Sequence, residues 1–189
     1  MLTSTPASLH SFAASGPTVL KSLSHPSIRT SEHPSQALQL YTTLLGSSDL
    51  DRSDELSHSV GFFQQFVKKK RDIRVTIVGK QSFAIAIESQ RSPLTAIDWR
   101  RYDLPRTPHS IITLDTAIHA KCVKFLDHFG LSYGAFDFAE DDAGEFWFLE
   151  LNPNGLWAWL ELLTGSPISG AVAEYLSALA SPKGEVGSP

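Results

Sequence analysis

Two side chains with oxygen donors alternate along one apolar segment in the last quarter of the chain. In the segment 146–152, Glu150 and Asn152 are two residues apart, and such residues point to the same face of a β-strand. The turn 141–144 joins this segment to 133–139, which predicts a β-hairpin. A four-residue turn would pair Glu140 with Glu145 and Asp137 with Phe148, on the face of Glu150. Three oxygen donors are therefore expected to converge.

Two carboxylates and a carboxamide are hard donors, and no His or Cys lies among them. This set favours Mg²⁺ or Mn²⁺ over zinc, and Mg²⁺ in proteins is commonly held by one or two carboxylates together with substrate phosphates. The pattern therefore points to a nucleotide. The alternative is that Asp137 and Glu150 are exposed strand residues and that Asn152 begins a turn, and the spacing alone leaves it open.

The composition excludes several other classes of protein. The 189 residues include 16 Lys and Arg against 20 Asp and Glu, so the net charge of −4 argues against nucleic acid and anionic membranes as partners. The basic run 68–71 is interpreted as a solvated turn. A single cysteine, Cys122, suits a reducing compartment and an inert core thiol. With no apolar run long enough to span a membrane and no signal peptide, a cytoplasmic protein is expected.

The elements expected to position these donors follow from hydrophobic spacing and turn residues. Apolar residues at intervals of three and four predict a helix over 113–129, and two more helices are expected after residue 155, the last over 168–179. The runs 62–67, 73–78 and 82–88 favour an antiparallel meander of three strands. Further strands are expected at 18–23 and 38–43. This order indicates an α+β fold.

Longer strings of residues resemble one enzyme family. The segments 133–137 and 148–155 resemble the C-terminal metal-binding segment of ATP-grasp ligases. The blocks 63–67, 70–75, 88–90 and 98–100, with the later segments 157–161 and 164–168, resemble the ATP-grasp peptide maturases of the microviridin or graspetide type. Those enzymes join side-chain carboxylates to hydroxyls or amines. The resemblance begins near Thr3 and covers most of the chain.

The resemblance implies an ATP-grasp fold of two α+β subdomains with antiparallel sheets, which hold a nucleotide between them. The small subdomain is expected at 1–66, the large subdomain with the metal site at 67–182, and a flexible tail at 183–189. Full-length relatives carry an N-terminal domain and a first lysine before the region that Leu2 and Thr3 resemble. The chain is therefore expected to lack that pre-ATP-grasp domain. A truncated gene model, a protein completed by a partner subunit and a degenerate relic are the alternatives that explain this, and a homo-oligomer or a partner subunit is the assembly considered.

The same resemblance assigns roles to individual residues. Asp137, Glu150 and Asn152 match the metal ligands, and Lys21 matches the strand lysine that reaches the ATP phosphates. The backbone of Gln64, Gln65, Phe66 and Val67 matches the hinge that meets adenine, and Arg74 and Arg100 match basic positions near the phosphates or an acyl-phosphate. Lys21 is otherwise a solvated surface lysine, and the alternative for both arginines is an ion pair with Asp72 or Asp98.

These residues imply a carboxylate ligase that depends on ATP and Mg²⁺ (or Mn²⁺) and acts through an acyl-phosphate. The expected partners are ATP and a peptide or small-molecule carboxylate. Two alternatives remain open, namely a non-catalytic nucleotide- or peptide-binding module and an ATP-grasp ligase that adds amino acids to a protein or a small acid.

Overall fold

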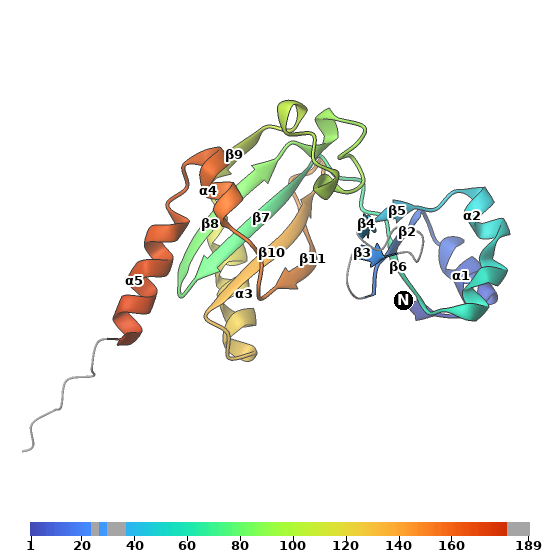
Figure 1. Ribbon diagram of the computed structural model, residues 1–189, viewed down its shortest axis with the longest axis horizontal. Helices are drawn as coiled ribbons and strands as arrows, with labels where there is room; N and C mark the ends of the chain where they lie inside the picture. Colours follow the sequence, from blue (N-terminus) through green and yellow to red (C-terminus); the bar gives the residue numbers. More distant parts are fainter. Residues whose placement is uncertain (24–26, 30–36, 181–189) are drawn as a thin grey trace, which may run out of the picture. The chain divides into compact units, whose positions relative to one another are not determined.

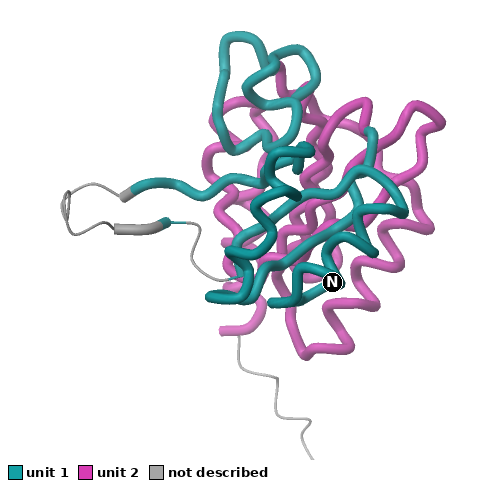
Figure 2. The backbone as a smooth tube through the Cα atoms, turned by 90° about the vertical axis from the view of Figure 1, so that its right-hand side faces the viewer, with its two compact units in different colours: residues 1–68, 89–107 teal, residues 69–88, 108–189 magenta. Residues whose placement is uncertain are grey.

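The computed structural model describes residues 1–23, 27–29 and 37–180. The chain divides into two compact units, residues 1–68 with 89–107 and residues 69–88 with 108–189, which Figure 2 colours separately. The sequence analysis drew one boundary at residue 67 and left the segment 89–107 in the second subdomain, whereas here this segment joins the first unit. The expected tail, 183–189, lies outside the described residues.

Unit 1 is built around a small antiparallel sheet with the strand order β1–β6–β2–β5. These strands are β1 (Leu2–Thr3), β6 (Gly61–Gln65), β2 (Thr18–Lys21) and β5 (Thr43–Leu44). The unit also contains α1 (Pro6–Ala13), α2 (Ser47–Asp51), the 3-10 helix η1 (Ser53–His58), and the strand pair β3 (Ser27–Arg29) with β4 (Ala37–Gln39). The inserted segment adds three 3-10 turns, η2 (Ser89–Arg91), η3 (Trp99–Arg101) and η4 (Leu104–Arg106).

Unit 2 contains a larger antiparallel sheet with the strand order β11–β10–β7–β8–β9 (Figure 1). The strands are β11 (Phe146–Asn152), β10 (Tyr133–Glu140), β7 (Arg71–Val78), β8 (Gln81–Ile87) and β9 (His109–Ile112). Helix α3 (Thr116–His128) covers one face, and α4 (Ala158–Thr164) with α5 (Ile168–Ala180) packs on the other. No helix among the described residues has the length and hydropathy needed to cross a membrane.

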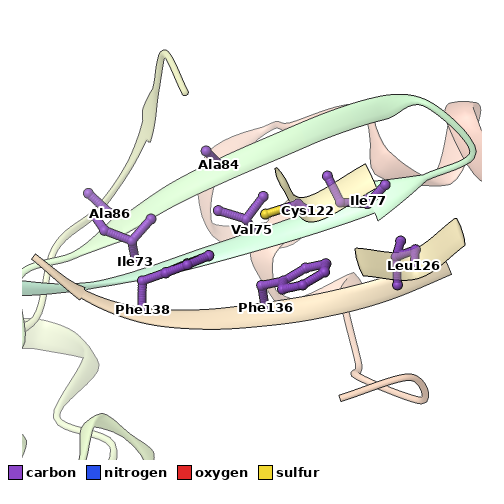
Figure 3. Packing of buried hydrophobic residues seen from close by; sticks show 9 residues of the cluster. All are labelled: Ile73, Val75, Ile77, Ala84, Ala86, Cys122, Leu126, Phe136 and Phe138. Carbon is purple, nitrogen blue, oxygen red and sulfur yellow. The ribbon is translucent and has the colours of Figure 1, made fainter. Parts of the chain in front are cut away.

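The main core lies between α3 and the sheet. Cys122 and Leu126 of α3 pack on Ile73, Val75 and Ile77 of β7 and on aromatic rings of β10 (Figure 3). Burial raises the pKa of the Cys122 thiol to about 11, which fits the expected inert core thiol. Because side chains alternate along a strand, the residues between these apolar positions of β7 must face away from α3.

Local signals explain where the elements of unit 2 begin and turn. The Asp115 carboxylate accepts hydrogen bonds from the backbone N–H groups of Ala117 and Ile118, which caps the first turn of α3. Between β7 and β8 the chain reverses over the two residues Gly79 and Lys80, and Gly79 has a φ of 58°, a left-handed conformation that glycine adopts without strain.

Two strand predictions were wrong. The predicted meander does not form, because β6 pairs on both sides within unit 1, with β1 and β2. Of the three predicted strands, β7 and β8 alone pair with each other. The predicted strand 38–43 is instead two short strands, β4 and β5, which belong to different sheets. In both cases the local residue preferences were suitable, but the pairing partners lie far away in the sequence.

Candidate functional site

Polar side chains gather on the face of the larger sheet that is opposite α3. On β7, Asp72, Arg74 and Thr76 alternate with the apolar residues that pack on α3. On β10, Asp137 lies between Phe136 and Phe138, whose rings belong to the same core. The α3 core therefore forces the charged residues of the central strands onto the opposite face.

A β-bulge places the second carboxylate opposite the first. Phe138 pairs with Phe148, but the register shifts after it, so that Asp137 pairs with Glu150 and Leu149 is the extra residue. The predicted register was wrong, because the loop spans 141–145 and Glu140 pairs with Phe146. Without the bulge, a strand in this register would not bring Glu150 beside Asp137.

The bulge also changes which face each side chain of β11 takes. Phe148 contacts the rings of Phe136 and Phe138 at centroid distances of 6.3 and 5.9 Å, so it lies on the α3 side, and the prediction that it shares a face with Glu150 was wrong. Leu151 also packs against the α3 core. By alternation, Glu150 and Asn152 face the opposite side, where Asp137 lies.

Arg74 and Asp137 form a buried cross-strand ion pair. The two residues are partners in the β7–β10 register, and Nη1 of Arg74 donates to Oδ2 of Asp137 at 2.6 Å. Their side chains are only 7% and 12% exposed. The pairing alternative for Arg74 is therefore present, but with Asp137 rather than with Asp72, which pairs with Lys69.

The Asp137 carboxyl lies in surroundings that disfavour its charge. Burial raises its pKa to about 6, although Arg74 lowers it, and the nearby carboxylates Glu150 and Asp72 raise it further. An additional cation close to Asp137 and Glu150 would relieve this cost. Asp137, Glu150 and Asn152 fit Mg²⁺ or Mn²⁺ because all three are oxygen donors.

Two further observations bear on ligand binding at this face. Within the described part of the chain, Nε of Arg74 and Oγ1 of Thr76 are the buried side-chain N or O atoms without a hydrogen-bond partner. Such groups are costly unless a ligand or water satisfies them. No group of three or more His, Cys, Asp or Glu side chains in the described ranges is arranged as a metal site.

The loop after β11 closes over the end of this face. Oδ1 of Asn152 accepts a hydrogen bond from the Asn154 N–H at 3.0 Å, and the Tyr133 hydroxyl donates to the Gly155 carbonyl. A Cβ at Gly155 would lie 2.5 Å from Cβ of Ala135 and 2.7 Å from Nη2 of Arg74. Only glycine allows the loop to pack this closely beside the ion pair.

Two residues of the basic run 68–71 form close ion pairs, whereas Lys68 and Lys70 are exposed. Lys69 is buried and bonds both carboxylate oxygens of Asp72, at 2.9 and 2.8 Å. Arg71 bonds Glu140 at 2.6 Å and also contacts Glu88. The prediction of a solvated turn was wrong for Lys69 and Arg71, because strand pairing brings carboxylates of β7, of β10 and of the residue after β8 next to them.

The remaining expected site residues lie in unit 1. Lys21 ends β2 and is partly buried, and just after β6 the backbone N–H of Phe66 donates to the Pro17 carbonyl. The Gln65 side chain donates to Ser15 Oγ. Since Phe63 exchanges backbone hydrogen bonds with Met1, alternation along β6 turns the backbone groups of Gln65 to the β1 side of the strand, and Val67 lies beyond the end of β6.

Arg100 forms the ion pair that the sequence offered as its alternative role. Its Nε and Nη2 donate to the two oxygens of Asp98 at 2.9 and 2.6 Å, a bidentate arrangement. The Asp98 carboxylate also accepts from the Thr42 N–H. Burial raises the pKa of Asp98, but the Arg100 hydrogen bonds outweigh it, and the net shift is downward. The sequence analysis did not assign Asp98 this anchoring role.

Solved structures identify the fold. The chain matches a RiPP-associated ATP-grasp ligase from Chryseobacterium gregarium, solved with ADP and a leader and core peptide, with a TM-score of 0.85 and 26% identity over 96% of this chain and 54% of that one. It matches the macrocyclase MdnC from Microcystis aeruginosa MRC, bound to the precursor peptide MdnA, with a TM-score of 0.81 and 31% identity over 95% and 56% of the two chains. No family model and no curated protein matches the chain.

A more distant structure, the D-cycloserine synthetase DcsG, has a TM-score of 0.63 at 14% identity and carries information on the fold alone. The chain spans about half the length of the first two structures. These matches confirm the α+β ATP-grasp fold and the resemblance to RiPP ATP-grasp ligases.

Proposed function

We propose that this chain is the ATP-binding part of a ligase that activates a carboxylate with ATP and Mg²⁺ (or Mn²⁺), and that its substrate is a ribosomally made peptide, which it crosslinks through ester or amide bonds. The observation that carries this proposal is the pairing of Asp137 with Glu150 across the bulge, beside Arg74. The RiPP-associated ligase and MdnC, each solved with a peptide, support the substrate class.

In this proposal Asp137, Glu150 and Asn152 hold the divalent cation. Bound there, the cation would neutralise charge on the phosphates and orient them. Arg74 lies next to this donor set, and its buried Nε is a hydrogen-bond donor that a phosphate or carboxylate oxygen would satisfy. Asn152 can serve as a ligand through Oδ1 only if that atom shares its lone pairs with the Asn154 N–H.

The adenine and the phosphates are assigned to unit 1. We assign the backbone groups of Gln65 and Val67 to adenine, because those of Gln65 point away from β2 and the N–H of Phe66 is already bonded to Pro17. Gln64 and Phe66 then position this hinge through their bonding to β2 and to the residue before it. We assign Lys21, a flexible cation at the end of β2, to the phosphates.

The proposed reaction has two steps. A substrate carboxylate oxygen attacks the γ-phosphorus, the bond to the β-phosphate oxygen breaks, and ADP leaves, which gives an acyl-phosphate. A hydroxyl or amine then attacks the acyl carbon, loses its proton, and releases phosphate. Both steps develop negative charge on oxygen, so Arg74 and Arg100 act by electrostatic stabilisation, and no covalent enzyme intermediate is needed. Arg100 must share its guanidinium with Asp98 to do so.

The ion pairs also favour a second candidate function. Both arginines assigned to catalysis already hold carboxylates, Arg74 that of Asp137 and Arg100 that of Asp98. A chain that binds a nucleotide or a peptide without catalysing a reaction needs neither arginine to be released. This observation supports a non-catalytic binding module as the alternative.

Calorimetric titration of the 189-residue chain with a non-hydrolysable ATP analogue, with and without Mg²⁺, tests the proposal. Binding is expected to depend on Mg²⁺ and to be weakened at least tenfold by Glu150→Gln, which removes one charged donor. Glu145→Gln is the matched control, because Glu145 is exposed in the same hairpin. Equal binding by both variants and the wild type would overturn the assignment of the metal site.

Single-turnover formation of ADP then separates the ligase from the module. With a peptide that contains Glu, Ser and Lys, the ligase is expected to release ADP and form a dehydrated product, visible by mass spectrometry as the loss of one water. A chain that binds the analogue but never forms ADP with any carboxylate peptide would support the module instead.

A further inference from the structure

A short turn in the inserted segment of unit 1 presents a basic and aromatic surface. The segment 89–107 contains four arginines and two aspartates, in a chain whose net charge is −4. Within it, η3 covers Trp99–Arg101 and is followed by Tyr102. Arg101 and Tyr102 are both exposed, Tyr102 to 57%.

The buried carboxylate of Asp98 fixes this turn. Asp98 is 4% exposed, caps η3 through the Arg100 N–H, and accepts the backbone N–H of Thr42 at 2.8 Å. It also holds the Arg100 guanidinium by two hydrogen bonds. Asp98 therefore ties the turn to residue 42, which lies far away in the sequence. By fixing Arg100, it also fixes the direction in which the side chain of the following residue, Arg101, projects from the turn.

Arg101 differs from its neighbouring arginines in its partners. Arg100 pairs with Asp98 and Arg106 with Asp103, whereas Arg101 has no carboxylate partner among the described residues. Its guanidinium carbon lies 5.0 Å from the centre of the Tyr41 ring. A cation–π contact occupies the face of the guanidinium and leaves its N–H edge for a planar anion.

The backbone after Arg101 is held in a rare conformation. Tyr102 is the one residue other than glycine with a positive φ in the described ranges, with φ 46° and ψ 102°. Such a conformation is costly for a bulky side chain and persists only where the surrounding structure enforces it, which is most often at ligand-binding sites. Here the Tyr102 N–H donates to the Trp99 carbonyl, and the rings of Trp99 and Tyr102 make an edge-to-face contact.

We propose that Arg101 is a specificity residue, held over Tyr41 and presented by the strained turn, that binds a carboxylate side chain of an acidic peptide. This proposal rests on the proposed function only for the role of that peptide as a substrate. A carboxylate matches the two parallel N–H groups of one guanidinium, and the flanking Tyr102 ring provides an apolar wall for the side-chain stem. A nucleic acid also carries anionic groups, and the experiment with hexauridylate distinguishes it from the acidic peptide.

Fluorescence anisotropy with a labelled hexaglutamate peptide and its hexaglutamine counterpart tests this proposal on the 189-residue chain. Hexaglutamate is expected to bind more tightly than hexaglutamine, and Arg101→Gln is expected to weaken its binding about fivefold, the size of an exposed charged pair. Arg101→Lys should recover only part of the loss, because lysine keeps the charge but not the planar pair of donors. Arg91→Gln is the matched control, since Arg91 is exposed in the same segment.

Equal weakening by Arg91→Gln and Arg101→Gln would overturn the proposal in favour of general charge attraction. Equally tight binding of a labelled hexauridylate would overturn it in favour of a polyanion site. Titration of Arg101→Gln with the ATP analogue and Mg²⁺ keeps this inference separate from the proposed function. Unchanged nucleotide binding supports a role toward the peptide, and a parallel loss of nucleotide binding overturns it. If the wild type binds hexaglutamate through Arg101 but binds no nucleotide, the proposed function fails while this inference stands.

Discussion

Replacing Asp137 with Asn should change how the stability of the chain depends on pH. Asp137 is buried next to Arg74, Glu150 and Asp72, and burial is the main reason that its pKa lies at about 6 rather than at its ordinary value of 3.8. Asn has nearly the same shape but does not titrate. Comparing the two proteins therefore isolates the proton that Asp137 binds on folding.

The sign follows from proton linkage. Between about pH 4 and pH 6 the folded chain binds a proton at Asp137 and the unfolded chain does not, so the free energy of unfolding falls as the pH rises. One pKa unit corresponds to about 1.4 kcal/mol, and the shift is about two units, so the contribution amounts to roughly 3 kcal/mol across the window. The stabilisation is complete below the ordinary pKa and is lost above pH 6.

Urea unfolding at several pH values from about 4 to 7.5, without divalent metal, measures this effect. The free energy of unfolding of the wild type minus that of Asp137→Asn should decrease by roughly 3 kcal/mol from the acidic to the neutral end. Taking the difference cancels the titration of the other carboxylates. Glu145→Gln, with its exposed carboxyl, provides the control and should give an almost constant difference.

A difference that stays constant with pH would refute this reasoning, because it would mean that Asp137 titrates alike in the folded and unfolded chains. A difference that rises with pH would show that Arg74 dominates over burial and lowers the pKa of Asp137. At pH 7.5, Mg²⁺ with the ATP analogue should stabilise the wild type and not the variant, since the cation removes the cost of the charged carboxylate.

Two further substitutions test the packing that supports the site. Gly155→Ala places a Cβ 2.5 Å from that of Ala135 and should lower the free energy of unfolding by about 1 to 3 kcal/mol. The control Gly170→Ala, in open space on α5, should raise the free energy of unfolding by up to about 1 kcal/mol. Thermal unfolding of both variants measures the two effects. Asp98→Asn should lower the free energy of unfolding by about 1 to 3 kcal/mol near pH 7, because Asn binds the Arg100 guanidinium more weakly. This difference should shrink as the pH falls below about 4, since the pKa of Asp98 is lowered in the folded chain. Urea unfolding at both pH values measures the difference.

The sequence predicted the elements of unit 2 well, because each has a local signal. The helix near 113–129 follows from apolar spacing, and the hairpin follows from the turn after residue 140. The register of that hairpin could not be predicted, because β11 has apolar residues on both sides of the bulge and no alternation reveals the extra Leu149. The proposed donors Asp137 and Glu150 are brought side by side by a backbone irregularity, which the residue types alone do not reveal.

The partners of the charged residues were also beyond the sequence. The alternative to a phosphate role for Arg74 was an ion pair with Asp72 or Asp98, but residues two apart on one strand do not face each other as closely as residues on adjacent strands do. Only the β7–β10 register shows that Asp137 faces Arg74. Lys69 was missed for the same reason, since its burial depends on how the start of β7 packs, not on the run of basic residues.

The arrangement of charges at this face explains why metal and nucleotide should bind together rather than in turn. Asp137 already holds Arg74, so a divalent cation that binds Asp137 and Glu150 alone must approach a buried guanidinium. A polyphosphate supplies negative charge for both the divalent cation and the Arg74 guanidinium. It also offers a hydrogen-bond acceptor to the buried Nε of Arg74, which has none within the described chain. Either ligand alone leaves one charge uncompensated at low dielectric. We therefore expect the titration with Mg²⁺ and the ATP analogue to measure the formation of a ternary complex of the chain, the metal and the nucleotide.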